Sequence, residues 1–238
     1  MRSSVPPQAS GFAENDDGRQ QTEAERREGS WTARKAPGRN RASPSGGNRP
    51  DSEPAVLAVP EAIGPPGLRY YPEIITPLLE LDLIERIRGL ALLPFQFGAF
   101  EGKRRVASFG FKYDYAERRL QEAGEVPEWL APIIGKIEAY GGPTAKIKQV
   151  LCTEYDAGVG IGWHRDKPHF DEVFGLSLGS ACKFRFRRKS GGKWERFTLD
   201  AEPRSLYIMT GESRHVWEHS IPPVEEPRYS ITFRSMAG

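Results

Sequence analysis

The sequence has little cysteine and no apolar run long enough to cross a membrane. Its two cysteines, Cys152 and Cys182, lack the short spacing of a zinc site or of a disulfide framework. We therefore expect buried thiols and a reducing compartment. No apolar run reaches the roughly 18 residues of a membrane-spanning helix, and residues 1–16 lack the apolar core of a signal peptide. These absences predict a cytoplasmic protein that makes no membrane contact.

A strong excess of charge of either sign is also missing. The chain has 34 basic and 32 acidic side chains, and its formal net charge is +2. Binding to nucleic acid therefore requires a local basic cluster, because overall charge does not provide it. Two clusters are candidates for phosphate contacts, and a solvated surface is the alternative interpretation of each. The first comprises Lys103, Arg104, Arg105, Lys112, Arg118 and Arg119, and the second Lys183, Arg185, Arg187, Arg188 and Lys189.

The first 66 residues lack the apolar side chains that a folded core needs. They are rich in Arg, Glu, Ser, Pro and Gly, and their only aromatic residues are Phe12 and Trp31. Such a segment buries too little apolar surface to offset the entropy lost on ordering. We predict a disordered polar tail over residues 1–66 and a folded domain over residues 67–238.

Two segments at the start of the folded part have the apolar spacing of amphipathic helices. Residues 74–93 show it around Thr76 and Pro77, a pair typical of a helix start. Residues 127–140 show it again, and we expect this second helix to cover a sheet. The apolar stripes are Leu78, Leu79, Leu83, Ile84 and Ile87 in the first helix, and Trp129, Leu130, Ile133, Ile134 and Ile137 in the second.

From residue 146 the pattern changes to short alternating runs, separated by Gly, Pro, Asp and Ser. The SGGK segment at 190–193 is typical of a hairpin turn. Many short strands at even spacing predict a sandwich or barrel, so the fold class is α+β with helices preceding a β core. The runs are KIKQVLCTEY at 146–155, FGLSLGS at 174–180, CKFRFRR at 182–188, WERFTLD at 194–200, SLYIMTG at 205–211 and YSITFR at 229–234.

His164 and Asp166 form the first pair of residues with metal chemistry. In an extended segment, residues two apart share a face, so this imidazole and this carboxylate can meet at one ion. An isolated HxD triplet is common by chance and needs a third ligand. By residue type, His169, His215 and His219 can each supply it. Two histidines and one carboxylate, with open positions, are the ligand set of non-haem iron(II) oxygenases.

The segment RYSITFR at 228–234 adds a second pattern. Its strict alternation places Arg228, Ser230, Thr232 and Arg234 on one face of a strand. Two guanidinium groups that point inward need an anionic partner, since unpaired buried charge is unfavourable and guanidinium forks match carboxylates. A dicarboxylic co-substrate meets this need. The alternative is a solvent-facing polar edge of the sheet.

Together, HRD at 164–166, WEHSI at 217–221 and RYSITFR resemble the AlkB family of iron(II)- and 2-oxoglutarate-dependent dioxygenases, over roughly residues 68–234. The resemblance implies a double-stranded β-helix, or jelly-roll, core. It also implies Fe(II), 2-oxoglutarate as co-substrate, and O2. Carried over by position, the resemblance assigns His164, Asp166 and His219 to iron, and Arg228, Arg234, Tyr155 and Thr153 to 2-oxoglutarate.

Two positions depart from the family pattern. Thr153 stands where the family often has Asn, so a single hydroxyl replaces a carboxamide at the co-substrate. Pro168 stands where DNA-repair members often have Asp, which weakens the inference to a particular damaged base. The W-x-H-x-I context favours His219 over His169 and His215 as the third ligand.

The resemblance further implies oxidative dealkylation of N-alkylated bases in DNA or RNA, with release of succinate, CO2 and formaldehyde. Phe109, Phe111, Tyr113 and Tyr115 lie where family members carry base-recognition elements, and alternating aromatic residues can stack on an extruded base. Packing in the core is the alternative for these four. The alternative functions are the same iron chemistry on a protein or small molecule, and a non-catalytic nucleic-acid-binding module. We expect a monomer whose partner is alkylated DNA or RNA.

Overall fold

The computed structural model describes residues 64–237, except residues 98–99, 115–116 and 144. Residues 1–63 of the predicted tail lie outside the described residues. Its last three residues are described, and the carbonyl oxygen of Pro66 accepts a hydrogen bond from the backbone N–H of Ser213. No helix in the described ranges has the length and apolar composition that a membrane span requires.

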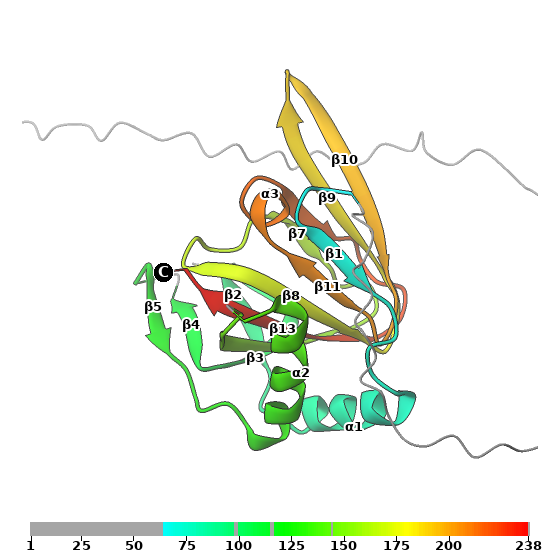
Figure 1. The fold of residues 1–238 in the computed structure, drawn as a ribbon. Coiled ribbons are helices and arrows are strands. Elements are labelled where there is room, and N and C mark those ends of the chain that lie inside the picture. The colour runs from blue at the N-terminus through cyan, green and yellow to red at the C-terminus, as the bar shows by residue number, and fades with distance from the viewer. Residues whose placement is uncertain (1–63, 98–99, 115–116, 144, 238) are drawn as a thin grey trace, which may run out of the picture. The chain divides into compact units, whose positions relative to one another are not determined.

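The described part of the chain begins with strands and helices and continues as a series of strands (Figure 1). In chain order the elements are β1 (Leu68–Tyr71), α1 (Pro77–Arg88), β2 (Leu93–Phe97), β3 (Phe100–Phe109), β4 (Phe111–Asp114), β5 (Arg119–Glu122), the 3-10 helix η1 (Glu128–Leu130), α2 (Ala131–Gly141), β6 (Ile147–Tyr155), β7 (Ile161–His164), β8 (Phe170–Leu178), β9 (Cys182–Ser190), β10 (Lys193–Ala201), β11 (Leu206–Met209), α3 (Gly211–His215), β12 (Glu218–Ile221) and β13 (Arg228–Met236).

Two antiparallel sheets form the core of the fold. The larger sheet has seven strands in the order β1-β11-β8-β13-β6-β3-β2, and the smaller has four in the order β10-β9-β12-β7. Apolar side chains from both sheets pack together, including Tyr207 and Val173 from the larger and Phe184 and Phe186 from the smaller. This arrangement is a double-stranded β-helix, which confirms the predicted core.

Helices α1 and α2 cover the other face of the larger sheet (Figure 1). A second core lies there, where Ile87 of α1 and Ile137 of α2 pack with sheet residues such as Val150 and Phe233. The helix predicted over residues 127–140 is confirmed as η1 and α2, and it covers a sheet as expected.

Helix α1 is shorter than the predicted 74–93. Thr76 caps its first turn, where its side-chain oxygen accepts a hydrogen bond from the backbone N–H of Leu79, and Gly89 ends it. The placement of Leu78 in the buried stripe was wrong, because its side chain is 79% exposed. Leu78 precedes the buried Ile87 by nine residues, which puts the two on roughly opposite sides of a helix.

The strands predicted from residue 146 onward are confirmed, as is the hairpin turn that joins β9 and β10. Ser190 pairs with Lys193, and both intervening glycines have positive φ, 54° at Gly191 and 81° at Gly192. Two positive φ values are what a two-residue type I′ turn requires. Strands β1 to β5 were not expected from the sequence, because they are short or highly charged. The extended backbone expected near His164 is confirmed by β7, although the bounds of β7 and β12 could not be read from the sequence.

Candidate metal centre and cavity

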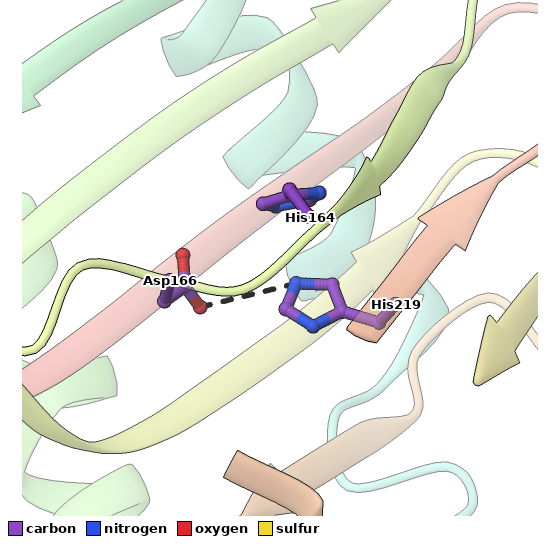
Figure 2. A group of neighbouring side chains, drawn as sticks. All are labelled: His164, Asp166 and His219. Atoms are coloured by element: carbon purple, nitrogen blue, oxygen red, sulfur yellow. Dashed lines mark ion pairs between the residues drawn. The ribbon is translucent and has the colours of Figure 1, made fainter. Parts of the chain in front are cut away.

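His164, Asp166 and His219 come together between the two sheets. His164 is the last residue of β7, and Asp166 follows it by two residues. His219 lies on β12, directly opposite His164 in the antiparallel register, and the two ring centroids are 4.2 Å apart. Figure 2 shows the Asp166 carboxylate turned toward His219. Oδ2 of Asp166 is 4.0 Å from Nε2 of His219. One potential ligand atom from each residue lies within 4.8 Å of the others.

The protonation states of these groups suit a metal ion. Burial lowers the pKa of His219 to about 3 and also lowers the pKa of His164, so both imidazoles are neutral at neutral pH. Burial alone would raise the pKa of the Asp166 carboxyl, but Arg234 and the two histidines outweigh burial and hold it well below its usual range. The group therefore offers two neutral nitrogens and one carboxylate.

The orientation of His164 also fits metal binding. Its Nδ1 lies 3.0 Å from the carbonyl oxygen of Gly162, an acceptor that favours the tautomer with hydrogen on Nδ1. That bond leaves Nε2 for a metal, an arrangement common among metal-binding histidines. Two imidazoles and one carboxylate beside an open cavity are the donor set that Fe(II) takes in non-haem oxygenases.

The three ligands line a cavity of about 500 Å³ that lies between the sheets. Thr153 and Tyr155, which the sequence analysis assigned to the co-substrate, line it from β6, and Arg234 lines it from β13. A cavity of this size accommodates a small-molecule ligand.

Tyr207 of β11 also lines the cavity, and Gly175 of β8 permits its position. A Cβ atom at Gly175 would lie 2.0 Å from the ring of Tyr207. Any residue other than glycine would therefore displace this ring. Neither residue was expected in the site from the sequence, although alternation along SLYIM places Tyr207 and Met209 on one face.

Arg234 is tied to the metal site. Its side chain is buried, and its Nη2 donates to Oδ1 of Asp166 at 3.0 Å. Its Nη1 donates to Oε1 of Gln149 at 2.7 Å. Arg234 therefore fixes one carboxylate oxygen of a metal ligand. Gln149 was missed from the sequence, although alternation back from Tyr155 along β6 points to it.

Arg228 is buried on the same face of β13, and it is 1% exposed. Its Nη2 donates to the hydroxyl of Ser177 at 3.0 Å, and its guanidinium carbon lies 5.0 Å from the ring centre of Tyr155. Its Nε and Nη1 have no acceptor among the described residues. Buried, unpaired N–H groups are unfavourable, so Arg228 is suited to an anion. Arg228 itself does not line the cavity, but its neighbour Tyr155 does.

The four aromatic residues predicted to recognise a base occupy different places. Tyr113 lines the cavity, with its ring centre 5.5 Å from that of His169 and 4.6 Å from Nζ of Lys167. Phe111 lies on β4 and does not line the cavity, and Tyr115 lies outside the described residues.

The prediction that Phe109 recognises a base is not supported, because its side chain packs against the core under the helices. The register of β3 with β6 places Phe109 opposite Val150, which belongs to the same core. Directly opposed residues of two strands point to the same face, so Phe109 points away from the cavity.

The two rival histidines lie apart from the metal group. The Nε2 of His215 is 3.6 Å from Oδ1 of Asp171, and its side chain is about half exposed. His169 is exposed beside Tyr113. Of the three candidates for the third ligand, only His219 joins His164 and Asp166.

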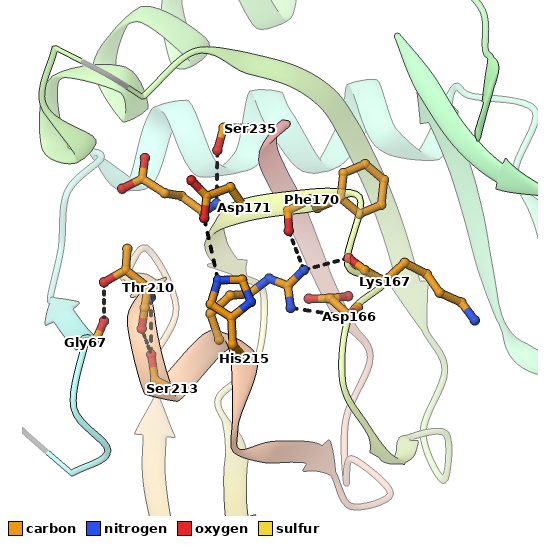
Figure 3. A network of polar contacts seen from close by, with 11 residues as sticks. Gly67, Asp166, Lys167, Phe170, Asp171, Thr210, Ser213, His215 and Ser235 are labelled. Atoms are coloured by element: carbon orange, nitrogen blue, oxygen red, sulfur yellow. Dashed lines mark hydrogen bonds and ion pairs between the residues drawn. The ribbon is translucent and has the colours of Figure 1, made fainter. Parts of the chain in front are cut away.

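Arg214 of α3 holds the loop that carries Asp166. It is 2% exposed, and among the described residues it donates only to backbone carbonyl oxygens. Its Nη1 donates to the carbonyl oxygen of Asp166 at 3.3 Å, and its Nη2 donates to those of Lys167 at 2.7 Å and Phe170 at 2.6 Å. Dashed lines in Figure 3 mark these bonds at the three labelled acceptor residues. These bonds fix the backbone after β7. No sequence pattern marks an arginine that bonds to backbone groups, so the role of Arg214 was not expected from the sequence.

Comparison with known proteins gives one family match. Residues 68–234 match the model of the 2OG-Fe(II) oxygenase superfamily. The chain is 30% identical over 192 residues to the "Alkylated DNA repair protein ALKBH8 homolog" of Arabidopsis thaliana, covering 70% of this chain and 54% of that protein. It is 33% identical over 166 residues to the "tRNA (carboxymethyluridine(34)-5-O)-methyltransferase ALKBH8" of Mus musculus, covering 67% and 24% respectively. The chain thus spans about half or less of these relatives.

The fold also resembles a solved structure titled "The structure of OsALKBH1". The TM-score is 0.56 at 17% identity, and the match covers 74% of this chain and 99% of the other. At this identity the similarity concerns the fold alone.

Proposed function

The chain belongs to the 2OG-Fe(II) oxygenase superfamily, and from this premise we propose that it oxidatively dealkylates N-alkylated bases in DNA or RNA. It is an oxygenase that uses Fe(II), 2-oxoglutarate and O2. One relative is named for the repair of alkylated DNA and another for a tRNA modification, so both kinds of nucleic acid are candidate substrates.

The observation that carries the proposal is the composition of the cavity. The metal ligands share it with Tyr113 and with the basic residues Lys112 and Lys167. An aromatic ring can stack on an extruded base, and ammonium groups can contact the flanking phosphates. From the sequence, Tyr113 was one of four candidates for base recognition and Lys112 one of six for phosphate contacts.

The roles of the chain's own residues follow from their contacts. His164, Asp166 and His219 would hold Fe(II), and Arg234 keeps Asp166 ionised and in place. When bound, Fe(II), 2-oxoglutarate and O2 supply an oxidation that yields succinate and CO2 and hydroxylates an N-methyl group, which then leaves as formaldehyde.

The co-substrate and the substrate would meet different parts of the cavity. Tyr155, which lines the cavity, would offer its phenolic hydroxyl to a carboxylate of 2-oxoglutarate. Arg228 lies beside Tyr155 and outside the cavity lining, and its guanidinium group would pair with that carboxylate when the co-substrate is bound. Tyr113 would stack on the target base. The buried, apolar surroundings formed by residues such as Phe184 would keep water from the reacting groups.

The test is succinate and formaldehyde production by the purified chain with Fe(II), 2-oxoglutarate and O2. The strands are DNA, RNA and tRNA that carry N1-methyladenine or N3-methylcytosine, each compared with its unmethylated form. We expect methylated strands to stimulate succinate formation with an equal amount of formaldehyde, and Asp166→Ala to abolish both. Succinate formation that no methylated strand stimulates would contradict the proposal and direct the search to protein or small-molecule substrates.

A further inference from the structure

The outer face of the smaller sheet carries cations and tryptophans in alternation. Strand β9 turns Phe184 and Phe186 inward to the core and Arg185 and Arg187 outward. Strand β10 places its own residues opposite these, with Arg196 across from Arg187. We call this surface the cation–tryptophan face, and it consists of Trp163, Arg185, Arg187, Lys189, Trp194 and Arg196.

The side chains of this face come from β10, β9 and β7, and β12 lies between the last two. The guanidinium carbon of Arg187 lies 4.4 Å from the ring centre of Trp163 on β7 and 4.4 Å from that of Trp194 on β10. Arg185 lies 5.1 Å from Trp163, and Nζ of Lys189 lies 5.9 Å from Trp194. These contacts bring the two indoles and three of the cations together on the surface.

The face has more positive than negative charge. Arg187 pairs with Glu218 at 2.7 Å, and the Nε of Arg185 donates to the hydroxyl of Ser220 at 3.2 Å. In the described part of the chain, neither Lys189 nor Arg196 has a carboxylate partner, and both are exposed. Trp194 is 37% exposed. Two cations and one indole are thus open to a ligand.

The face is continuous with the cavity. Trp163 lies between Gly162 and His164 on β7, and it lines the cavity and belongs to the cation–tryptophan face. Strand β12 likewise turns His219 inward and Glu218 outward. At the other end, Figure 1 shows the β9–β10 hairpin, which carries Lys189 and Trp194, extending beyond the neighbouring strands. A chain bound along the face would therefore lead from the hairpin to the mouth of the cavity.

We propose that the cation–tryptophan face binds single-stranded nucleic acid, with phosphates at Lys189 and Arg196 and bases stacked beside Trp194. The proposal rests on the proposed function and adds to it the surface that would lead the strand to the cavity. Nucleic acid fits better than an acidic peptide, because the face combines cations with indole rings. Cations attract either ligand, but only nucleic acid has a flat aromatic surface at every residue.

The test is binding of a fluorescein-labelled, unmethylated, single-stranded RNA of mixed sequence to the full chain, followed by fluorescence anisotropy over a range of salt concentrations. Lys189→Gln should weaken binding and reduce the slope of log K against log salt by about 0.7, the value for one contact to a single strand. Trp194→Ala should weaken binding about tenfold. The matched control is Lys136→Gln, because Lys136 is exposed on α2 behind the larger sheet, and it should change neither quantity.

The outcomes separate this proposal from the proposed function. If the strand binds and Lys189→Gln and Trp194→Ala behave like Lys136→Gln, the face does not bind nucleic acid, whether or not methylated strands are dealkylated. If polyglutamate binds and RNA does not, the face serves an acidic polypeptide and the proposal is wrong. The proposal is supported if both variants bind RNA more weakly and form succinate without a strand at the same rate as the parent chain. This holds even if the methylated bases tested are not substrates.

Discussion

Replacing Arg228 with Met separates binding of the co-substrate from stability of the fold. In the structure its guanidinium group is buried, donates one hydrogen bond to Ser177 and has two nitrogens without an acceptor among the residues described. With 2-oxoglutarate bound, we expect those nitrogens to pair with a carboxylate. Removing one partner of a buried ion pair costs about 3–5 kcal/mol, so the Kd for 2-oxoglutarate should rise at least about a hundredfold.

The free energy of unfolding should respond differently. Without the co-substrate, the unpaired guanidinium destabilises the folded chain, and Met fills much of the same volume without a charge. Replacing a buried ion pair by apolar side chains of similar volume is often neutral or stabilising, by about 1–4 kcal/mol, and the charge removed here has no carboxylate partner among the described residues. The variant should therefore melt at the same temperature as the parent chain, or higher.

The assay is calorimetric titration of 2-oxoglutarate with Mn(II) in place of iron, together with the melting temperature of the metal-free chain. Arg86→Met is the matched control, because Arg86 is about half exposed on α1 and pairs with Asp82 at 2.8 Å. It should leave the Kd unchanged. An unchanged Kd for Arg228→Met, or a large loss of stability without co-substrate, would refute the role assigned to Arg228.

Three further predictions concern the metal centre and the cavity. Arg214→Met removes three hydrogen bonds to the loop that carries Asp166, so the affinity of the chain for Mn(II) should fall about tenfold or more. The circular dichroism spectrum should stay unchanged. An unaltered Mn(II) affinity would contradict the role of Arg214. Because burial lowers the pKa of His219 to about 3, the unfolded chain takes up this proton first. The metal-free chain should therefore lose stability as pH falls from about 6.5 toward 3, by at most about 1.4 kcal/mol per pH unit for this histidine. In chemical denaturation, the free energy of unfolding of His219→Gln should depend less steeply on pH than that of the parent chain. An equally steep dependence would count against this role of His219. In steady-state kinetics, Tyr113→Ala should raise the KM for a methylated strand and leave the KM for 2-oxoglutarate unchanged. A change in the KM for 2-oxoglutarate alone would argue against base stacking.

The inner face of β13 could be read from the sequence because it depends on local alternation alone. Arg228 and Arg234 share a face in any extended strand, and the structure buries both. Likewise, His164 and Asp166 are close in the chain, so their convergence needs only an extended backbone. These two predictions therefore do not depend on knowing which strands pair in the sheets.

Features set by the pairing of distant strands could not be read in this way. Phe109 faces the helices because β3 pairs with β6 in one particular register, and the alternation along β3 fits either face. The position of His219 opposite His164 depends on β12 and β7, which are too short to give a pattern. In the described part of the chain, Arg214 bonds only to backbone carbonyl oxygens, which any sequence provides.

The most direct test of the account is the mass of a methylated strand after incubation with the purified chain, Fe(II), 2-oxoglutarate and O2. The account predicts that the strand loses its methyl group, with one formaldehyde released for each succinate formed, and that Asp166→Ala leaves the strand unchanged. A strand that keeps its methyl group in the presence of active, iron-loaded protein would contradict it.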